Sequence, residues 1–190
     1  MKRKVYVALL PILAVFLPFQ TASAISPAPA LPGLTPKESV ANDIWILRAG
    51  LNVAALQCQF SPFLQTVPTY NALLRQHSDE LAAAFAQMTG YFRRMQKGRA
   101  GERAFDTYAT RANQSWSTFD AQLAFCDAAS RIGKRALAVP KGQLGPFATS
   151  ELAEFRSSLG IHYSEPLRDL KLEWVTLPDV NQFCGKKRCR

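Results

Sequence analysis

The chain has 190 residues, a formal net charge of +9, 48% hydrophobic residues and four cysteines. This balance excludes an intrinsically disordered chain, and the length excludes a large multidomain enzyme. Residues 1–24 combine a cationic start, an apolar stretch at 5–19 and the small-residue cleavage pattern Ala22-Ser23-Ala24, which is typical of a secretory signal peptide. We expect cleavage near Ala24 and a periplasmic or secreted location. No later stretch has the ~20 consecutive apolar residues of a membrane-spanning helix, so we expect no transmembrane segment in the mature chain.

Residues 25–34 form a proline-rich stretch that we interpret as an extended linker. A single helical domain is predicted for residues 35–183. Its first helix begins at the capping sequence Thr35-Pro36-Lys37-Glu38 and ends near Phe60. Apolar residues follow helical spacing along it, namely Val40, Ile44, Leu47, Leu51, Ala54 and Cys58.

The same periodicity predicts a second helix from Pro68 to about Met95 and a third from Glu102 to about Ile132. A shorter fourth helix is predicted to start at Thr149 or Ser150 and to end at Gly160. The prolines of residues 162–183 favour an irregular C-terminal segment. We therefore predict an all-α fold, an antiparallel three-helix bundle with a shorter fourth helix.

Four cysteines in an exported chain indicate disulfide bonds. If the second and third helices are continuous, Cys58 and Cys126 lie at similar heights on neighbouring helices, so we predict that these two residues are bonded. Cys184 and Cys189 would then pair within the basic tail, residues 184–190. Free thiols or a bond to another chain remain alternatives for the tail.

Catalytic and metal chemistry has little support in the sequence. The phosphate-binding, dinucleotide-binding, serine-hydrolase, zinc-protease and haem-attachment motifs are all absent, and we predict no cofactor. His77 and Glu80 lie three residues apart on one helical face, so both could bind one metal ion. A histidine that is hydrogen-bonded at the edge of the core is the commoner interpretation of this pattern. Asn113 belongs to a polar row that is either solvated or lines a groove facing Asn52 or Asn71. The candidate ligand pocket is Asn71, His77, Glu80 and Asn113.

Basic residues form three clusters, at residues 93–103, 131–141 and 186–190. The first two are predicted at opposite ends of the bundle, so one nucleic-acid footprint would not cover both and we predict no nucleic-acid partner. The clusters suit contact with anionic envelope components or another envelope protein, although solvated helix ends are an equal alternative. The tail residues predicted to contact an anionic surface are Lys186, Lys187, Arg188 and Arg190.

Three segments, GLNVAALQCQF, YNALLRQH and FDTYATRANQSWSTFDAQLAFC, resemble small exported α-helical proteins of Gram-negative, alphaproteobacterial bacteria. They belong to the three long predicted helices, about half of the chain. The resemblance implies export and a helical fold, and it implies no catalytic residue. The linker and the CGKKRCR tail fall outside it.

These observations favour an exported, non-catalytic helical protein that acts as an envelope-associated binding or interaction module. The alternative is a small hydrolase or ligand-processing protein that uses His77 and Glu80 with the polar row of the third helix. The sequence specifies neither a ligand nor an oligomeric state.

Overall fold

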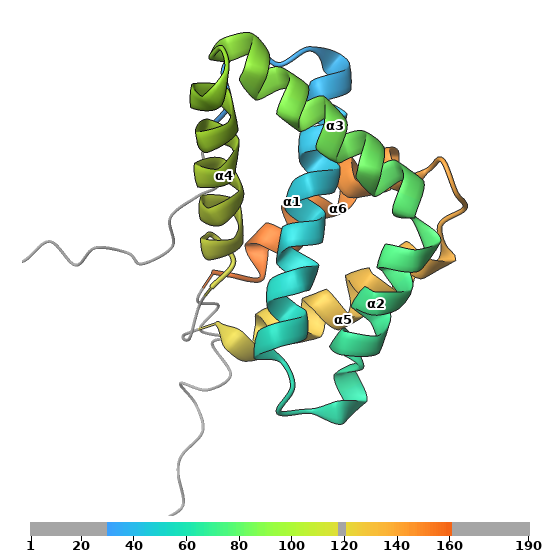
Figure 1. The fold of residues 1–190 in the computed structure, drawn as a ribbon. Helices are drawn as coiled ribbons and strands as arrows, with labels where there is room; N and C mark the ends of the chain where they lie inside the picture. The colour runs from blue at the N-terminus through green and yellow to red at the C-terminus, as the bar shows by residue number, and fades with distance from the viewer. Residues whose placement is uncertain (1–29, 118–120, 161–190) are drawn as a thin grey trace, which may run out of the picture.

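The computed structural model describes residues 30–117 and 121–160, and this part of the chain is helical without any strand (Figure 1). The predicted all-α class is confirmed. The predicted signal peptide, the first half of the linker (residues 25–29), residues 161–183 and the tail with Cys184 and Cys189 lie outside the described residues. The elements are α1 (Pro36–Gln57), the 3-10 turn η1 (Pro62–Leu64), α2 (Thr66–Gln76), α3 (Ser78–Met95), α4 (Arg99–Gln114), α5 (Gln122–Ala138) and α6 (Leu144–Ser157).

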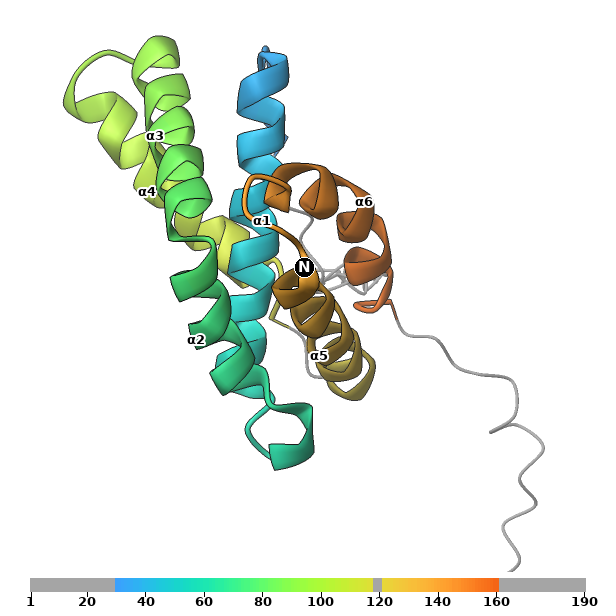
Figure 2. The same ribbon diagram turned by 90° about the vertical axis from the view of Figure 1, so that its right-hand side faces the viewer.

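Helix α1 begins as predicted, with a complete capping box. The Thr35 hydroxyl accepts a hydrogen bond from the Glu38 amide at 3.3 Å, and the Glu38 carboxylate accepts one from the Thr35 amide at 2.8 Å. Helix α1 then contacts every other α-helix. In Figure 2 it lies between α3 and α4 on one side and α5 and α6 on the other. It is the central helix of the fold.

The second predicted helix is two helices, because the chain bends at His77 (φ −107°, ψ 25°). The bend keeps helix-type hydrogen bonds: the His77 amide donates to Leu73 O, and the Leu81 amide donates to His77 O. Helix α2 thereby packs on α5, while α3 packs on α1 and α4. The prediction of one continuous helix from Pro68 to Met95 was wrong.

The third predicted helix is also two helices, separated by residues 115–121. Helix α4 ends where Trp116, which is fully buried, turns inward to contact Phe125 and Phe155 with ring-centroid distances of 6.1 and 4.3 Å. Trp116 thereby contacts one aromatic residue of α5 and one of α6. The predicted arrangement of three long antiparallel helices is therefore not confirmed.

Helix α6 starts at Leu144 and not at the predicted Thr149 or Ser150. The reason is a contact from another helix: the Leu144 amide donates to the Glu80 carboxylate of α3 at 2.8 Å. This contact satisfies an N-terminal amide that has no partner within α6. Thr149 lies inside α6, where its hydroxyl donates to Asp43 of α1 at 2.7 Å.

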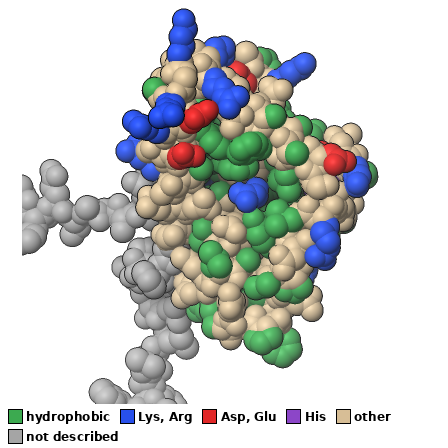
Figure 3. All heavy atoms as spheres, viewed as in Figure 1, with side chains coloured by type: hydrophobic (Ala, Val, Ile, Leu, Met, Phe, Trp, Pro, Cys, Tyr) green, Lys and Arg blue, Asp and Glu red, His purple; other side chains and the backbone are tan. Residues whose placement is uncertain are grey.

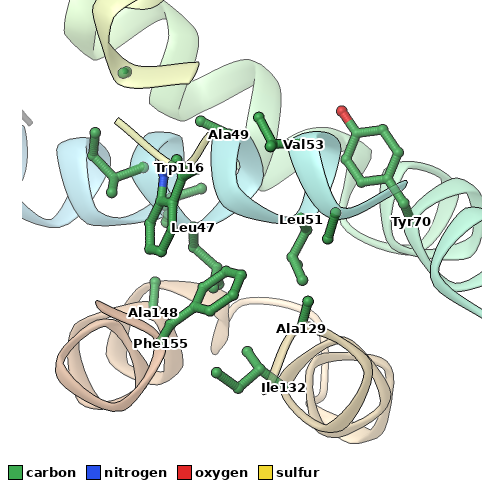
Figure 4. Close-up of a cluster of buried hydrophobic side chains, with 14 of the residues drawn as sticks. Leu47, Ala49, Leu51, Val53, Tyr70, Trp116, Ala129, Ile132, Ala148 and Phe155 are labelled. Atoms are coloured by element: carbon green, nitrogen blue, oxygen red, sulfur yellow. The ribbon is translucent and has the colours of Figure 1, made fainter. Parts of the chain in front are cut away.

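The core surrounds the middle of α1 (Figure 4). Leu47 and Leu51 face α5 and α6, where Ile132 and Phe155 are completely buried. Gly50 permits the closest approach, because a Cβ at this position would lie 2.5 Å from Phe155 and 2.9 Å from Trp116. The position therefore requires glycine for packing.

The predicted disulfide between Cys58 and Cys126 is confirmed, although the geometric reason given for it is not. Cys58 caps the C-terminus of α1, and Cys126 lies on α5, a separate short helix that packs against α1. Both cysteines are completely buried.

Removal of this disulfide should cost about 4 kcal/mol in the free energy of unfolding, because 68 residues separate the two cysteines and the bond restricts a long loop in the unfolded chain. Urea denaturation of the wild type and of the Cys58→Ser/Cys126→Ser variant measures this loss. An unchanged midpoint would show that the bond adds no stability.

Gly50→Ala should destabilise the fold by about 1–3 kcal/mol, because the added methyl group overlaps two aromatic rings. The matched control is Gly90→Ala on α3, where a Cβ meets nothing within 4 Å. Thermal unfolding followed by circular dichroism compares the two variants. Equal melting temperatures for both would contradict the packing assigned to Gly50.

Candidate functional site

His77 and Glu80 form a buried hydrogen-bond network that joins four helices. The His77 ring lies at the bend between α2 and α3, with Nδ1 at 2.7 Å from Glu80 Oε2 and Nε2 at 3.2 Å from Ala136 O of α5. The other Glu80 oxygen accepts from the Leu144 amide of α6. Both ring nitrogens therefore face acceptors, and a catalytic role for His77 would first require one of these bonds to break.

The Glu80 carboxyl group is held in its ionised form. Its burial raises the pKa, but hydrogen bonds from His77 and from the amides of Leu144 and Gly142 outweigh burial and hold the pKa below its ordinary value. This carboxylate is a structural acceptor at the start of α6.

The other two residues of the predicted pocket lie in different surroundings. Asn71 is exposed on α2. Asn113, on α4, is half-buried, and its side chain bonds to Asn52 at 3.4 Å and to Ala109 O at 2.9 Å. The predicted facing of Asn52 and Asn113 is present, whereas no described hydrogen bond links Asn71 or Asn113 to the His77–Glu80 pair. A ligand-binding or catalytic role for the four residues stays a prediction.

Metal binding has no geometric support among the residues that the structure describes. No three His, Cys, Asp or Glu side chains in residues 30–117 and 121–160 come together in a group that could hold a metal ion.

In the basic cluster at residues 131–141, the two arginines are paired with carboxylates of α5 and α6. Arg131 pairs with Asp127 at 3.1 Å and with Glu154 at 2.6 Å, and Arg135 pairs with both Glu151 and Glu154. The hydrogen bonds from Arg135 and Arg131 lower the pKa of Glu154 below its ordinary value. The pairs with Glu151 and Glu154 are not evident from the sequence, because these residues lie 16 to 23 positions from the arginines.

The cluster at residues 93–103 is only partly neutralised. Arg93 lies 3.6 Å from Glu102, and Arg94 lies 2.6 Å from Glu38. Among the described residues, neither the Arg103 nor the Arg111 guanidinium group forms an ion pair or a hydrogen bond; the Arg103 carbonyl accepts from the Thr107 hydroxyl at 2.9 Å. Both are exposed on α4, two helical turns apart and ~12 Å along its axis. These two guanidinium groups are available to an anion.

Arg103 and Arg111 line an apolar groove of about 450 Å³, which we call the α4 groove. Its apolar lining comes from Leu31, Phe92, Tyr108 and two alanines of α4. The Tyr108 hydroxyl donates to Asn42, and burial raises the pKa of Tyr108, so this wall remains uncharged. The result is a hydrophobic groove with two cations at its edge, which sequence reasoning missed because Leu31, Phe92 and α4 are distant along the chain.

A larger groove of about 540 Å³ lies between α1, α3 and α6, but it has fewer charged groups available to a ligand. It is lined by apolar residues such as Val40 and Ile44, with Lys37 and Glu80 as its charged groups. Glu80 already accepts hydrogen bonds from His77 and the start of α6. The α4 groove is therefore the stronger candidate site.

The Glu80→Gln variant tests the structural role of the carboxylate through the pH dependence of the free energy of unfolding. Because the folded-state pKa of Glu80 is lowered, its stabilising effect is present above the unfolded-state pKa, near 4.5, and is lost as the pH falls through the folded-state pKa. We expect the variant to lose about 1 kcal/mol at pH 7 and to show a shallower loss of stability below pH ~4.5 than the wild type.

Urea denaturation across pH 3 to 7 measures both effects. Asp79→Asn is the matched control, because Asp79 is an exposed neighbour whose carboxylate bonds only to Ser78 in the described part of the chain. Identical pH profiles for Glu80→Gln and the wild type would contradict the role assigned to Glu80.

Comparisons with protein-family models, with curated proteins and with solved structures found no match for this chain. The resemblance to exported helical proteins therefore stays a prediction, and the candidate site rests on the geometry of the α4 groove.

Proposed function

We propose that the protein is an exported, non-catalytic binding module of the cell envelope, and that its α4 groove holds an anionic amphiphile. The observation that carries this proposal is the pair Arg103 and Arg111, which has no carboxylate partner in the described part of the chain and borders an apolar groove. An acyl chain would contact the apolar lining, and its anionic head group would face the two arginines.

The distribution of charge around α4 supports this assignment. Glu102 and Asp106 line a separate groove between α3 and α4, where Arg93 lies close to Glu102. Arg103, Thr107 and Arg111 follow one another at four-residue steps and line the α4 groove. Because arginine side chains are long and flexible, both guanidinium groups can reach one head group placed above Thr107.

The disulfide supports export. Disulfides persist in oxidising compartments such as the periplasm and are rare in the cytosol, and the Cys58–Cys126 bond is completely buried in this fold. No helix in residues 30–117 and 121–160 is long and apolar enough to cross a membrane. The basic tail, Lys186 to Arg190, lies outside the described residues, and we propose it as a second contact with anionic envelope material.

Arg103→Gln/Arg111→Gln should weaken binding of dodecyl phosphate by about 10-fold or more, because two charge-assisted contacts are lost. Isothermal titration calorimetry below the critical micelle concentration measures the affinity. Dodecanol, which lacks the anionic head, should bind the wild type more weakly than dodecyl phosphate does.

The matched control is Lys97→Gln/Arg99→Gln. It removes the same charge from the same end of the molecule, at exposed residues that do not line the α4 groove. We expect its affinity to stay within about 3-fold of the wild type. Equal weakening in both double variants would indicate diffuse attraction and would overturn the assignment of the groove.

A further inference from the structure

The end of the molecule where α1 turns into α2 exposes several large hydrophobic side chains. Phe63 of η1 is 92% exposed, and Phe60 is 54% exposed. Leu56 and Val67 flank them, and Leu123 is exposed at the start of α5. We call this surface the apolar tip, formed by Leu56, Phe60, Phe63, Val67 and Leu123.

The apolar tip contains no charged residue. Residues 49–74 include no Asp, Glu, Lys or Arg, although charged residues make up 19% of the whole chain. On the face drawn in Figure 3, hydrophobic side chains lie at the lower end and no charged side chain is visible there. Docking of this end into an apolar medium would therefore dehydrate no ion.

The exposed aromatic residues lie on an ordered segment. The Leu64 and Gln65 amides donate to Ser61 O and Pro62 O within the 3-10 turn, both at 3.2 Å. The Ser130 hydroxyl of α5 donates to Leu64 O at 2.8 Å, and Leu64 itself packs against the core. Adjacent residues thus face opposite ways, with Leu64 inward and Phe63 outward.

Helix α5 forms two further bonds to the segment between α1 and α2. The Gln122 side chain donates to Gln57 O at 3.1 Å, and the disulfide joins Cys58 to Cys126. These bonds satisfy the carbonyl groups of Gln57 and Leu64. These two carbonyl groups therefore need no partner from the surroundings of the tip.

The shape of the tip favours a bilayer over a protein partner. Figures 1 and 2 both show the α1–α2 turn projecting at one end of the molecule. Among the described residues, five exposed side chains at this end are large and hydrophobic, whereas a standard protein interface uses roughly 20–30 residues per partner. A bilayer interface accepts a small projecting apolar surface without a complementary groove.

We propose that the apolar tip inserts into the interface of a lipid bilayer and holds the protein at the membrane surface. Insertion is driven by burial of Phe60 and Phe63, so it does not require anionic lipid. It goes beyond the proposed function, because the tip and the α4 groove share no residue.

The test is flotation of the mature chain, which begins after the predicted cleavage near Ala24 and so lacks the apolar stretch at residues 5–19, with phosphatidylcholine vesicles in 0.5 M salt. We expect the wild type to float and Phe60→Ser/Phe63→Ser to lose about 10-fold or more in partition coefficient. Phe60→Trp/Phe63→Trp should retain binding. The matched control, Val40→Ser/Met95→Ser, removes apolar residues with exposed fractions of 40% and 47% from other surfaces and should stay within about 2-fold of the wild type.

A second measurement localises the contact. Brominated acyl chains quench tryptophan at short range, so the emission that Phe63→Trp adds to the wild-type spectrum should be quenched in brominated vesicles. Emission from that tryptophan that stays unquenched while the protein is bound would overturn the proposal. So would equal flotation of wild type and Phe60→Ser/Phe63→Ser, or a wild-type dimer in sedimentation experiments that this variant abolishes.

The results that test the apolar tip are independent of those that test the α4 groove. Arg103→Gln/Arg111→Gln should float with phosphatidylcholine vesicles as well as the wild type does, because those arginines lie outside the tip. Conversely, the tip variants should bind dodecyl phosphate normally.

Discussion

The fold depends on the burial of α1 on all sides. Its buried residues include Ile44, Ile46, Leu47, Ala49 and Leu51, which do not share one face of a helix. A helix of this kind needs neighbours all around it, and two further long helices cannot supply them. Five shorter helices do, because the chain bends at His77 and leaves the helix at Trp116 so that α2, α5 and α6 cover surfaces that α3 and α4 leave open.

The sequence predicted the helical class, the start of α1 and the disulfide because each has a local or chemical signature. The breaks had no such signature: His77 keeps its helical hydrogen bonds, and Trp116 continues the apolar spacing of α4. The all-round burial of α1 corresponds to the nearly continuous apolar stretch of residues 44–56, from which the helical spacing alone predicts only one buried stripe. The early start of α6 depends on Glu80, 64 residues away, and no local pattern contains it.

The candidate site was hidden for the same reason. A count of basic residues cannot tell which of them are paired, and the pairing here crosses long stretches of sequence. Arg135 bonds to Glu151 and Glu154 on the next helix, and Arg94 bonds to Glu38 on α1, 56 residues away. Among the basic residues of the described part of the chain that form no ion pair, Arg103 and Arg111 are singled out because both line the apolar α4 groove. Conversely, His77 is one of two histidines and Glu80 lies three residues from it, and both form hydrogen bonds at the junction of α2, α3, α5 and α6.

The Cys58–Cys126 bond also affects how strongly the apolar tip can dock, because it orders the segment that carries Phe60 and Phe63. A flexible loop with exposed phenylalanines would lose conformational entropy on docking, which opposes binding. Here the disulfide and the Ser130 and Gln122 hydrogen bonds already order the segment between α1 and α2. The conformational entropy of the backbone around Phe60 and Phe63 is therefore lost largely during folding. Little further entropy is lost on docking, so burial of the two rings contributes more of its free energy to binding.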